Sequence, residues 1–146
     1  MLKTHAAQWW PIPLRLVVGY GFLAHGFAKL LRGAGAFAAV LHALGVPFPS
    51  AMALATIGIE LVGGAAVLLG AWVRLAVGPL AIVMIVAALS VHLPYGFSSI
   101  KLVEVTATGP RFGPPGYEVN LMYLASLVAL AVGGSGPLSL EKEKRR

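Results

Sequence analysis

Charged and histidine side chains are rare in this sequence, yet several stand inside or at the ends of long apolar runs, and five of them could do chemistry together. These residues are His25, Lys29, Glu60, His92 and Glu118. Together they supply two imidazoles, an amine and two carboxylates. Such groups can hold a polar headgroup and exchange protons with it, because histidine changes its charge near neutral pH and carboxylates act as general acids and bases.

Glu60 is the most informative of the five. It lies near the centre of an apolar run, roughly 10 Å from the nearer end at a rise of about 1.5 Å per residue. The run is long enough to cross a membrane, and in a membrane span a glutamate at this depth is too short to reach the surface. It must therefore pair, take up a proton or line a cavity. Two interpretations remain open: a structural pair with His25 or Lys29, and a functional site.

The other polar residues also have structural interpretations. Arg15 is expected to extend along the helix to the inner headgroups, and Lys29 could do the same at the outer surface. His92 could simply end a helix, Glu118 could favour the dipole at a helix N-terminus, and Asn120 could hydrogen-bond to an adjacent helix.

A metal site is a further alternative. His25, His92, Glu60 and Glu118 are acceptable ligands for zinc, iron or copper. However, they belong to no local ligand signature and stand at different depths, so we expect no metal. The absence of cysteine excludes thiolate ligands and disulfides within this chain.

The elements that must position these groups are four apolar runs. Apolar residues make up 58% of the 146 residues and charged residues only 11%, whereas a soluble domain has about 25% charged residues. The sequence therefore predicts an all-α membrane protein, a single domain over residues 1–146 built as a four-transmembrane-helix bundle. The predicted spans cover residues 14–31, 51–70, 75–93 and 117–132.

Two connectors, residues 32–50 and 94–116, are predicted to be external loops. Within them, residues 37–44 have the apolar spacing of a short surface helix, and residues 100–106 are rich in β-branched side chains, which favours a short strand pair or a lid. Loops as long as the second one usually have a function.

The distribution of basic residues predicts the orientation. One side of the predicted bundle has six (Lys3, Arg74, Lys142, Lys144, Arg145 and Arg146), and the other has three (Arg32, Lys101 and Arg111). The side richer in lysine and arginine is normally cytoplasmic, so we expect both termini in the cytoplasm of a multi-pass protein of the cell inner (plasma) membrane. The net charge of +6 is then explained by a rim of basic residues that faces the membrane surface, and no nucleic-acid partner is expected. The first apolar run is too long for a cleaved signal peptide, so we expect it to be retained.

Taken in order, these residues resemble a family pattern that covers nearly the whole chain. The matching positions are Arg15 and Gly19, His25-Gly26 with Lys29, Gly45-x-Pro47, Glu60 with Gly63-Gly64 and Gly70, Arg74, His92, Glu118-x-Asn120, and a closing Gly-rich turn with Ser139-Leu140. This pattern resembles the DoxX family of small bacterial and archaeal membrane proteins, which is named after the small subunit of a thiosulfate:quinone oxidoreductase.

The resemblance implies a four-helix membrane bundle linked to quinones and oxidoreductases. It carries over His25, Lys29, Glu60, His92 and Glu118 as functional candidates. The sequence departs from the family at Glu141, where many members have aspartate, and the loop 95–116 matches no family segment, so no substrate class follows.

The resulting hypothesis is a membrane component of a quinone-linked oxidoreductase system with a polar site in the outer half of the bundle. Glu60 and His25 would bind and protonate a quinone oxygen, and His92 would relay protons outward. Lys29 and Glu118 would form an ion pair at the mouth of the site, with Asn120 beside them. Since the chain has no flavin, haem or iron–sulfur motif, electrons would come from a second subunit or a small reductant.

The alternative is a non-enzymatic membrane anchor or assembly partner for a soluble oxidoreductase. In that case the polar cluster is structural, and the small residues of the helices serve packing or homo-oligomer formation. The lipid bilayer is a partner under both hypotheses.

Overall fold

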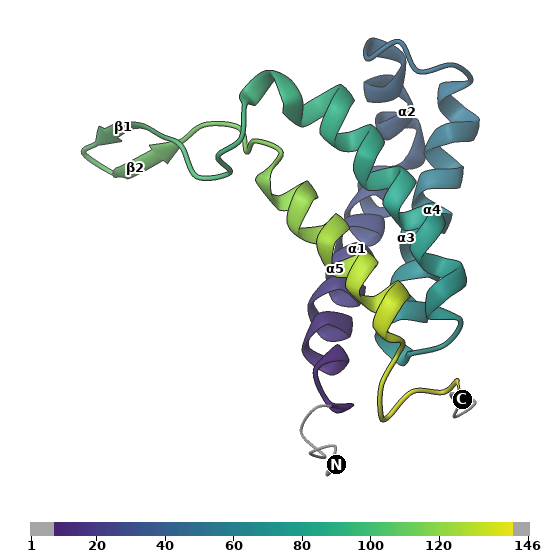
Figure 1. Ribbon diagram of the computed structural model, residues 1–146. Coiled ribbons are helices and arrows are strands. Elements are labelled where there is room, and N and C mark those ends of the chain that lie inside the picture. Colours follow the sequence, from purple (N-terminus) through teal and green to yellow (C-terminus); the bar gives the residue numbers. More distant parts are fainter. Residues whose placement is uncertain (1–7, 142–146) are drawn as a thin grey trace.

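The structure, a computed structural model, describes residues 8–141 and consists mainly of helices (Figure 1). Its elements are α1 (Pro11–Arg32), α2 (Ala34–Ala43), α3 (Pro49–Leu69), α4 (Val73–Ala87), a π-helical turn (Ala88–His92), a 3-10 turn (Leu93–Tyr95), β1 (Leu102–Thr106), β2 (Gly109–Phe112) and α5 (Glu118–Gly133). The two strands form an antiparallel hairpin, so the fold is mainly helical rather than all-α as predicted. The β-branched residues of the second connector explain this hairpin.

Three helical stretches within residues 8–141 are long and apolar enough to cross a membrane: Pro11–Arg32, Pro49–Leu69 and Val73–Tyr95. The predicted span 117–132 corresponds to α5, which has 16 residues and is a shorter apolar helix.

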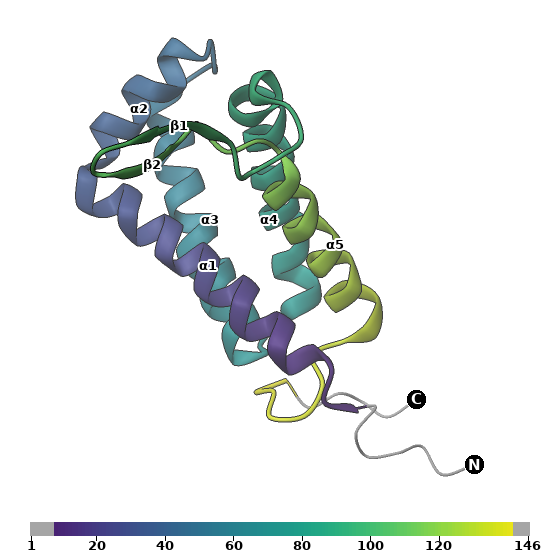
Figure 2. The same cartoon turned by 90° about the vertical axis from the view of Figure 1, so that its left-hand side faces the viewer.

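The helices α1, α3, α4 and α5 run alternately up and down, and α2 continues toward the same end of the bundle as α1 (Figures 1 and 2). The α1–α2–α3 connection and the hairpin lie toward one end of the bundle. The tight α3–α4 turn lies at the other end, beside the start of α1 and the segment that follows α5. Of the basic residues used to predict orientation, Lys3, Lys142, Lys144, Arg145 and Arg146 lie outside the described residues.

The helices α1 and α3 pack most closely, because glycines face each other where they cross. A Cβ atom at Gly64 would lie 2.9 Å from the backbone nitrogen of Leu23 and 3.0 Å from the carbonyl oxygen of Gly19. Small residues of this kind let helices in a membrane approach closely. The main apolar core joins four helices through Val18, Phe22, Val67, Val73, Val77, Leu80, Met84, Leu127 and Leu130.

The third predicted span changes its winding before it ends. α4 stops at Ala87 and continues as the π-helical turn Ala88–His92, in which the hydroxyl of Ser90 donates to the carbonyl oxygen of Val86 at 2.6 Å. Wide π turns within helices are frequent at functional sites. This one places His92 at the start of the connector that leads to the hairpin.

Candidate functional site

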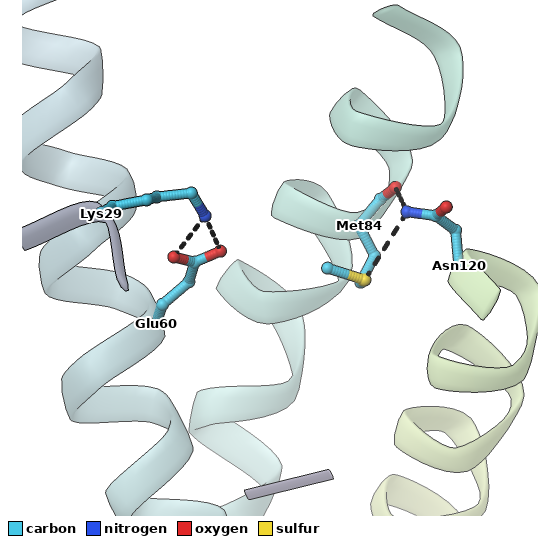
Figure 3. Close-up of polar contacts among 4 residues, drawn as sticks. All are labelled: Lys29, Glu60, Met84 and Asn120. Atoms are coloured by element: carbon cyan, nitrogen blue, oxygen red, sulfur yellow. Dashed lines mark hydrogen bonds and ion pairs between the residues drawn. The ribbon is translucent and has the colours of Figure 1, made fainter. Parts of the chain in front are cut away.

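The buried carboxylate of Glu60 is held by Lys29. Glu60 is 1% exposed on α3, and the Nζ atom of Lys29 on α1 donates to both of its carboxylate oxygens (Figure 3). The side chain of Lys29 is 25% exposed, so the carboxylate of the pair is buried and the lysine remains accessible. Of the two structural partners that the sequence leaves open for Glu60, the structure selects Lys29.

A glycine on α1 explains how the pair forms. At Gly26, a Cβ atom would lie only 2.9 Å from the side chain of Leu61 and 3.2 Å from the Cβ of Glu60. Because Gly26 has no side chain, α3 brings Glu60 against α1, one helical turn before Lys29. The lysine then extends to the carboxylate.

A residue that sequence reasoning missed completes the surroundings of Lys29. The Nζ atom lies 5.1 Å from the centre of the Phe37 ring on α2, a cation–π distance. The helical spacing of residues 37–44 indicated a short helix, but nothing in the sequence indicated that this helix packs beside the ends of α1 and α3. The ammonium is thus held between a carboxylate and an aromatic face.

The structure does not bring His25 into this pair. His25 is exposed on α1 and has no hydrogen-bond partner among residues 8–141, whereas the hypothesis joins it to Glu60. The predicted ion pair between Lys29 and Glu118 is wrong. Lys29 takes Glu60 instead, and a carboxylate oxygen of Glu118 accepts the backbone N–H of Ser99 at 2.9 Å.

His92 and Glu118 lie in a second polar cluster, which holds the base of the hairpin loop. The Nδ1 atom of His92 lies 3.0 Å from the carbonyl oxygen of Pro115. The hydroxyl of Ser99 donates to the carbonyl oxygen of Gly116 at 3.3 Å, beside the contact from Ser99 to Glu118. These contacts fix the loop to the ends of α4 and α5, and sequence reasoning did not identify the role of Ser99.

Asn120 connects two helices. It is 5% exposed on α5, and its Nδ2 atom donates to the carbonyl oxygen of Met84 on α4 at 3.4 Å (Figure 3). The sulfur of Met84 lies 3.8 Å from the same nitrogen. This is the contact to an adjacent helix that its structural interpretation predicts.

Arg15 does not extend to the headgroups, so that prediction is wrong. It is 5% exposed, and its guanidinium donates to five carbonyl oxygens. Two of these belong to Val67 and Leu68 in the last turn of α3, and the others to Ser135, Pro137 and Leu138. The segment after α5 folds back beneath the bundle, and the arginine is enclosed before it can reach lipid.

No metal cluster accompanies these residues within residues 8–141. No three histidine or acidic side chains there lie close enough to hold a metal ion. Two apolar grooves, of about 300 and 680 Å³, run along α3, and none of the candidate site residues lines either groove.

Comparison with known proteins identifies the family. The DoxX family matches residues 11–93, from the start of α1 to the turn that follows α4. The chain belongs to the DoxX family, and with its three long apolar helices it is a membrane protein. Lys29, Glu60 and His92 lie within the matched region, and Glu118 and Asn120 lie beyond it. No curated protein and no solved structure matches the chain.

Proposed function

We propose that this DoxX protein is a membrane component of a quinone-linked oxidoreductase system, and that Lys29 and Glu60 form the polar end of its quinone site. The observation that supports this is the unequal burial of the pair: the carboxylate is 1% exposed and the lysine 25%. When the carboxylate is buried and its lysine partner is accessible, the pair can exchange a proton with a ligand that approaches from the lysine side.

The residues fit the chemistry of a quinone, which combines a flat ring, carbonyl oxygens and an apolar tail. A lysine ammonium has three N–H groups, and two hydrogen bonds to Glu60 leave one for a quinone oxygen. The ring of Phe37, already beside the ammonium, would offer a flat apolar surface. The bound quinone would accept electrons from a partner subunit or a small reductant. The Lys29–Glu60 pair would hold a proton that a reduced quinone oxygen takes up.

The remaining candidates take supporting roles in this proposal. His25 is exposed and precedes Lys29 by one helical turn, so it would exchange protons between the pair and the surroundings. His92 and Glu118 would keep the hairpin loop beside the outer end of the bundle, and Asn120 would fix α5 to α4. We also propose that α5 is the fourth span, since it is apolar and packs against α4 and α1, with both termini in the cytoplasm and the chain in the plasma membrane.

The test is mass spectrometry of lipid-soluble molecules that copurify with the protein in mild detergent. We expect one quinone per wild-type chain and none with folded Glu60→Gln. Glu104→Gln is the matched control, because Glu104 pairs with Arg111 on the exposed hairpin, and it should retain the quinone. Absence of quinone from the wild type, or its retention by folded Glu60→Gln, would overturn the proposal.

A second candidate function is a non-enzymatic membrane anchor or assembly partner for a soluble oxidoreductase. Within residues 8–141, every buried side-chain nitrogen and oxygen has a hydrogen-bond partner, and the two apolar grooves along α3 do not reach the pair. A polar cluster that satisfies itself favours a structural role. Under this function the wild type carries no quinone, and Glu60→Gln lowers stability and the yield of the assembled complex together.

A further inference from the structure

We propose that the β1–β2 hairpin lies on the membrane surface, with one of its faces in contact with lipid. Figure 1 shows the hairpin projecting from the side of the bundle, near the end where α4 stops and α5 begins. This inference concerns a region outside the Lys29–Glu60 pair and does not depend on quinone binding.

The strand register places four apolar side chains on one face of the hairpin. Leu102 pairs with Phe112 and Val105 with Pro110, and directly opposed residues share a face of the hairpin. An irregularity between Leu102 and Glu104 shifts the alternation, which places Leu102 and Val105 on the same face. We call the four residues Leu102, Val105, Pro110 and Phe112 the apolar face.

The opposite face carries the charged side chains of the strands. Glu104 pairs with Arg111 in the register, and the Nε atom of Arg111 lies 2.8 Å from a carboxylate oxygen of Glu104. Thr106 pairs with Gly109 on the same side, and its hydroxyl donates to the Gly109 carbonyl oxygen at 2.8 Å. The charges and the hydroxyl are therefore held away from the apolar face.

No part of the described chain covers the apolar face. The exposed fractions are 59% for Leu102, 74% for Val105 and 56% for Phe112. A single two-stranded hairpin is only marginally stable in water and needs another apolar layer. Something outside residues 8–141 of this chain must therefore supply that layer.

The position of the hairpin favours lipid as that layer. It extends sideways from a membrane bundle at the level where two apolar helices end (Figure 1). Aromatic residues occur at the same level: Tyr95 and Phe97 are exposed, and Phe97 meets the ring of Tyr117 edge-on at 5.7 Å. Aromatic side chains concentrate where helices leave the hydrocarbon, and elements with one apolar and one charged face lie in this interface.

Because the chain has no cysteine, the two faces can be probed with single labels. Val105→Cys and Glu104→Cys place a fluorophore on neighbouring residues of opposite faces. The full-length variants are labelled with an environment-sensitive fluorophore and reconstituted into phosphatidylcholine–phosphatidylglycerol vesicles. Quenching is then measured with aqueous iodide and with phospholipids that carry a nitroxide near the headgroup. Val62→Cys, at an exposed position of α3, verifies that the nitroxide lipids reach a membrane helix.

We expect the label at residue 105 to emit at shorter wavelength than the label at 104. We also expect the nitroxide lipids to quench it at least twofold more, and iodide to quench it at least twofold less. Equal iodide quenching at both residues would mean that the hairpin lies in water, which overturns the proposal. Protection of residue 105 from both quenchers would mean that protein, such as a second copy of the chain, covers the face, and this also overturns it.

Discussion

Two cations enter the interior of this membrane protein from the same helix, and their surroundings differ. Arg15, near the start of α1, is 5% exposed and donates to five backbone carbonyl oxygens. Lys29, near the end of α1, is 25% exposed and is held by one carboxylate and one aromatic ring. The first site has every N–H group occupied, and the second has one N–H group left for another molecule.

The Arg15 site is a structural clamp. The last carbonyl groups of a helix have no partner within that helix. Here Arg15 takes those of Val67 and Leu68, and the backbone N–H groups of Leu140 and Glu141 take those of Leu69 and Gly70. The negative end of the α3 dipole also favours a cation at this position. One side chain thus connects α1, α3 and the segment after α5.

The comparison teaches that a buried charge is not by itself a sign of function. The neutral acceptors around Arg15 converge on it from two segments and enclose it completely. Lys29 and Glu60 leave a donor accessible, and this is why the proposed function is assigned to that pair.

The largest effect should come from removing the clamp. Arg15→Met leaves several buried carbonyl groups without donors, so we expect the free energy of unfolding to fall by about 3–5 kcal/mol. Thermal unfolding in detergent, or the yield of folded protein, measures the loss. Arg74→Met is the matched control: Arg74 is exposed, and its replacement should change stability by less than about 0.5 kcal/mol. Equal melting of both variants would show that Arg15 is not a clamp.

The helix contact between the two cations should come next. Gly64→Ala would press a methyl group against the backbone of α1, and we expect a loss of about 1–3 kcal/mol. At Gly58, on the same helix, a Cβ would meet no other atom within 4 Å, so Gly58→Ala should be neutral or slightly stabilising. The ratio of folded to aggregated protein after gel filtration reports the difference. If Gly64→Ala is tolerated as well as Gly58→Ala, α1 and α3 are not in the close contact described.

Breaking the ion pair should affect stability less than breaking the clamp. Glu60→Gln leaves the charge of Lys29 without its partner, but the exposed part of this lysine can reach water. We expect a loss of about 1–2 kcal/mol. Adding Lys29→Met should restore part of that stability, because it removes the unpaired charge, without restoring quinone binding. Thermal unfolding of the single and double variants tests this. A loss as large as that of Arg15→Met would end the distinction between the two cations.

The smallest effect should come from the aromatic ring beside Lys29. Phe37→Leu keeps an apolar side chain but removes the cation–π contact, which is worth about 0.5–1 kcal/mol. Phe48→Leu is the control, since Phe48 is 79% exposed. Denaturant unfolding of both variants is the measurement, and we expect only Phe37→Leu to show a shift. A shift of the same size in Phe48→Leu would mean that the Phe37 ring makes no specific contribution at Lys29.

Much of this arrangement can be predicted from local sequence. The predicted helical runs 14–31 and 51–70 overlap α1 and α3, and the β-branched stretch 100–106 overlaps β1, because hydropathy and local propensity act over neighbouring residues. The position of Glu60 within an apolar run was sufficient to predict that it needs a partner.

The local sequence did not decide which partner each group takes, although Lys29 was one of the two alternatives for Glu60. The sequence indicated that Arg15 reaches the headgroups and that Lys29 pairs with Glu118, and both predictions are wrong. Each outcome depends on a segment distant in the chain. Residues 135–138 fold back over Arg15, and Gly26 lets α3 place Glu60, rather than Glu118, beside Lys29.

The sequence by itself therefore determined the class of this protein, its membrane character and the positions of its long helices. These follow from the apolar composition and from the cost of leaving backbone groups unpaired in lipid. Only the tertiary structure decided which cation is fully enclosed and which keeps an accessible N–H group. That choice depends on which carbonyl oxygens, carboxylate and ring converge on each cation, and convergence is a property of helix packing rather than of any local pattern.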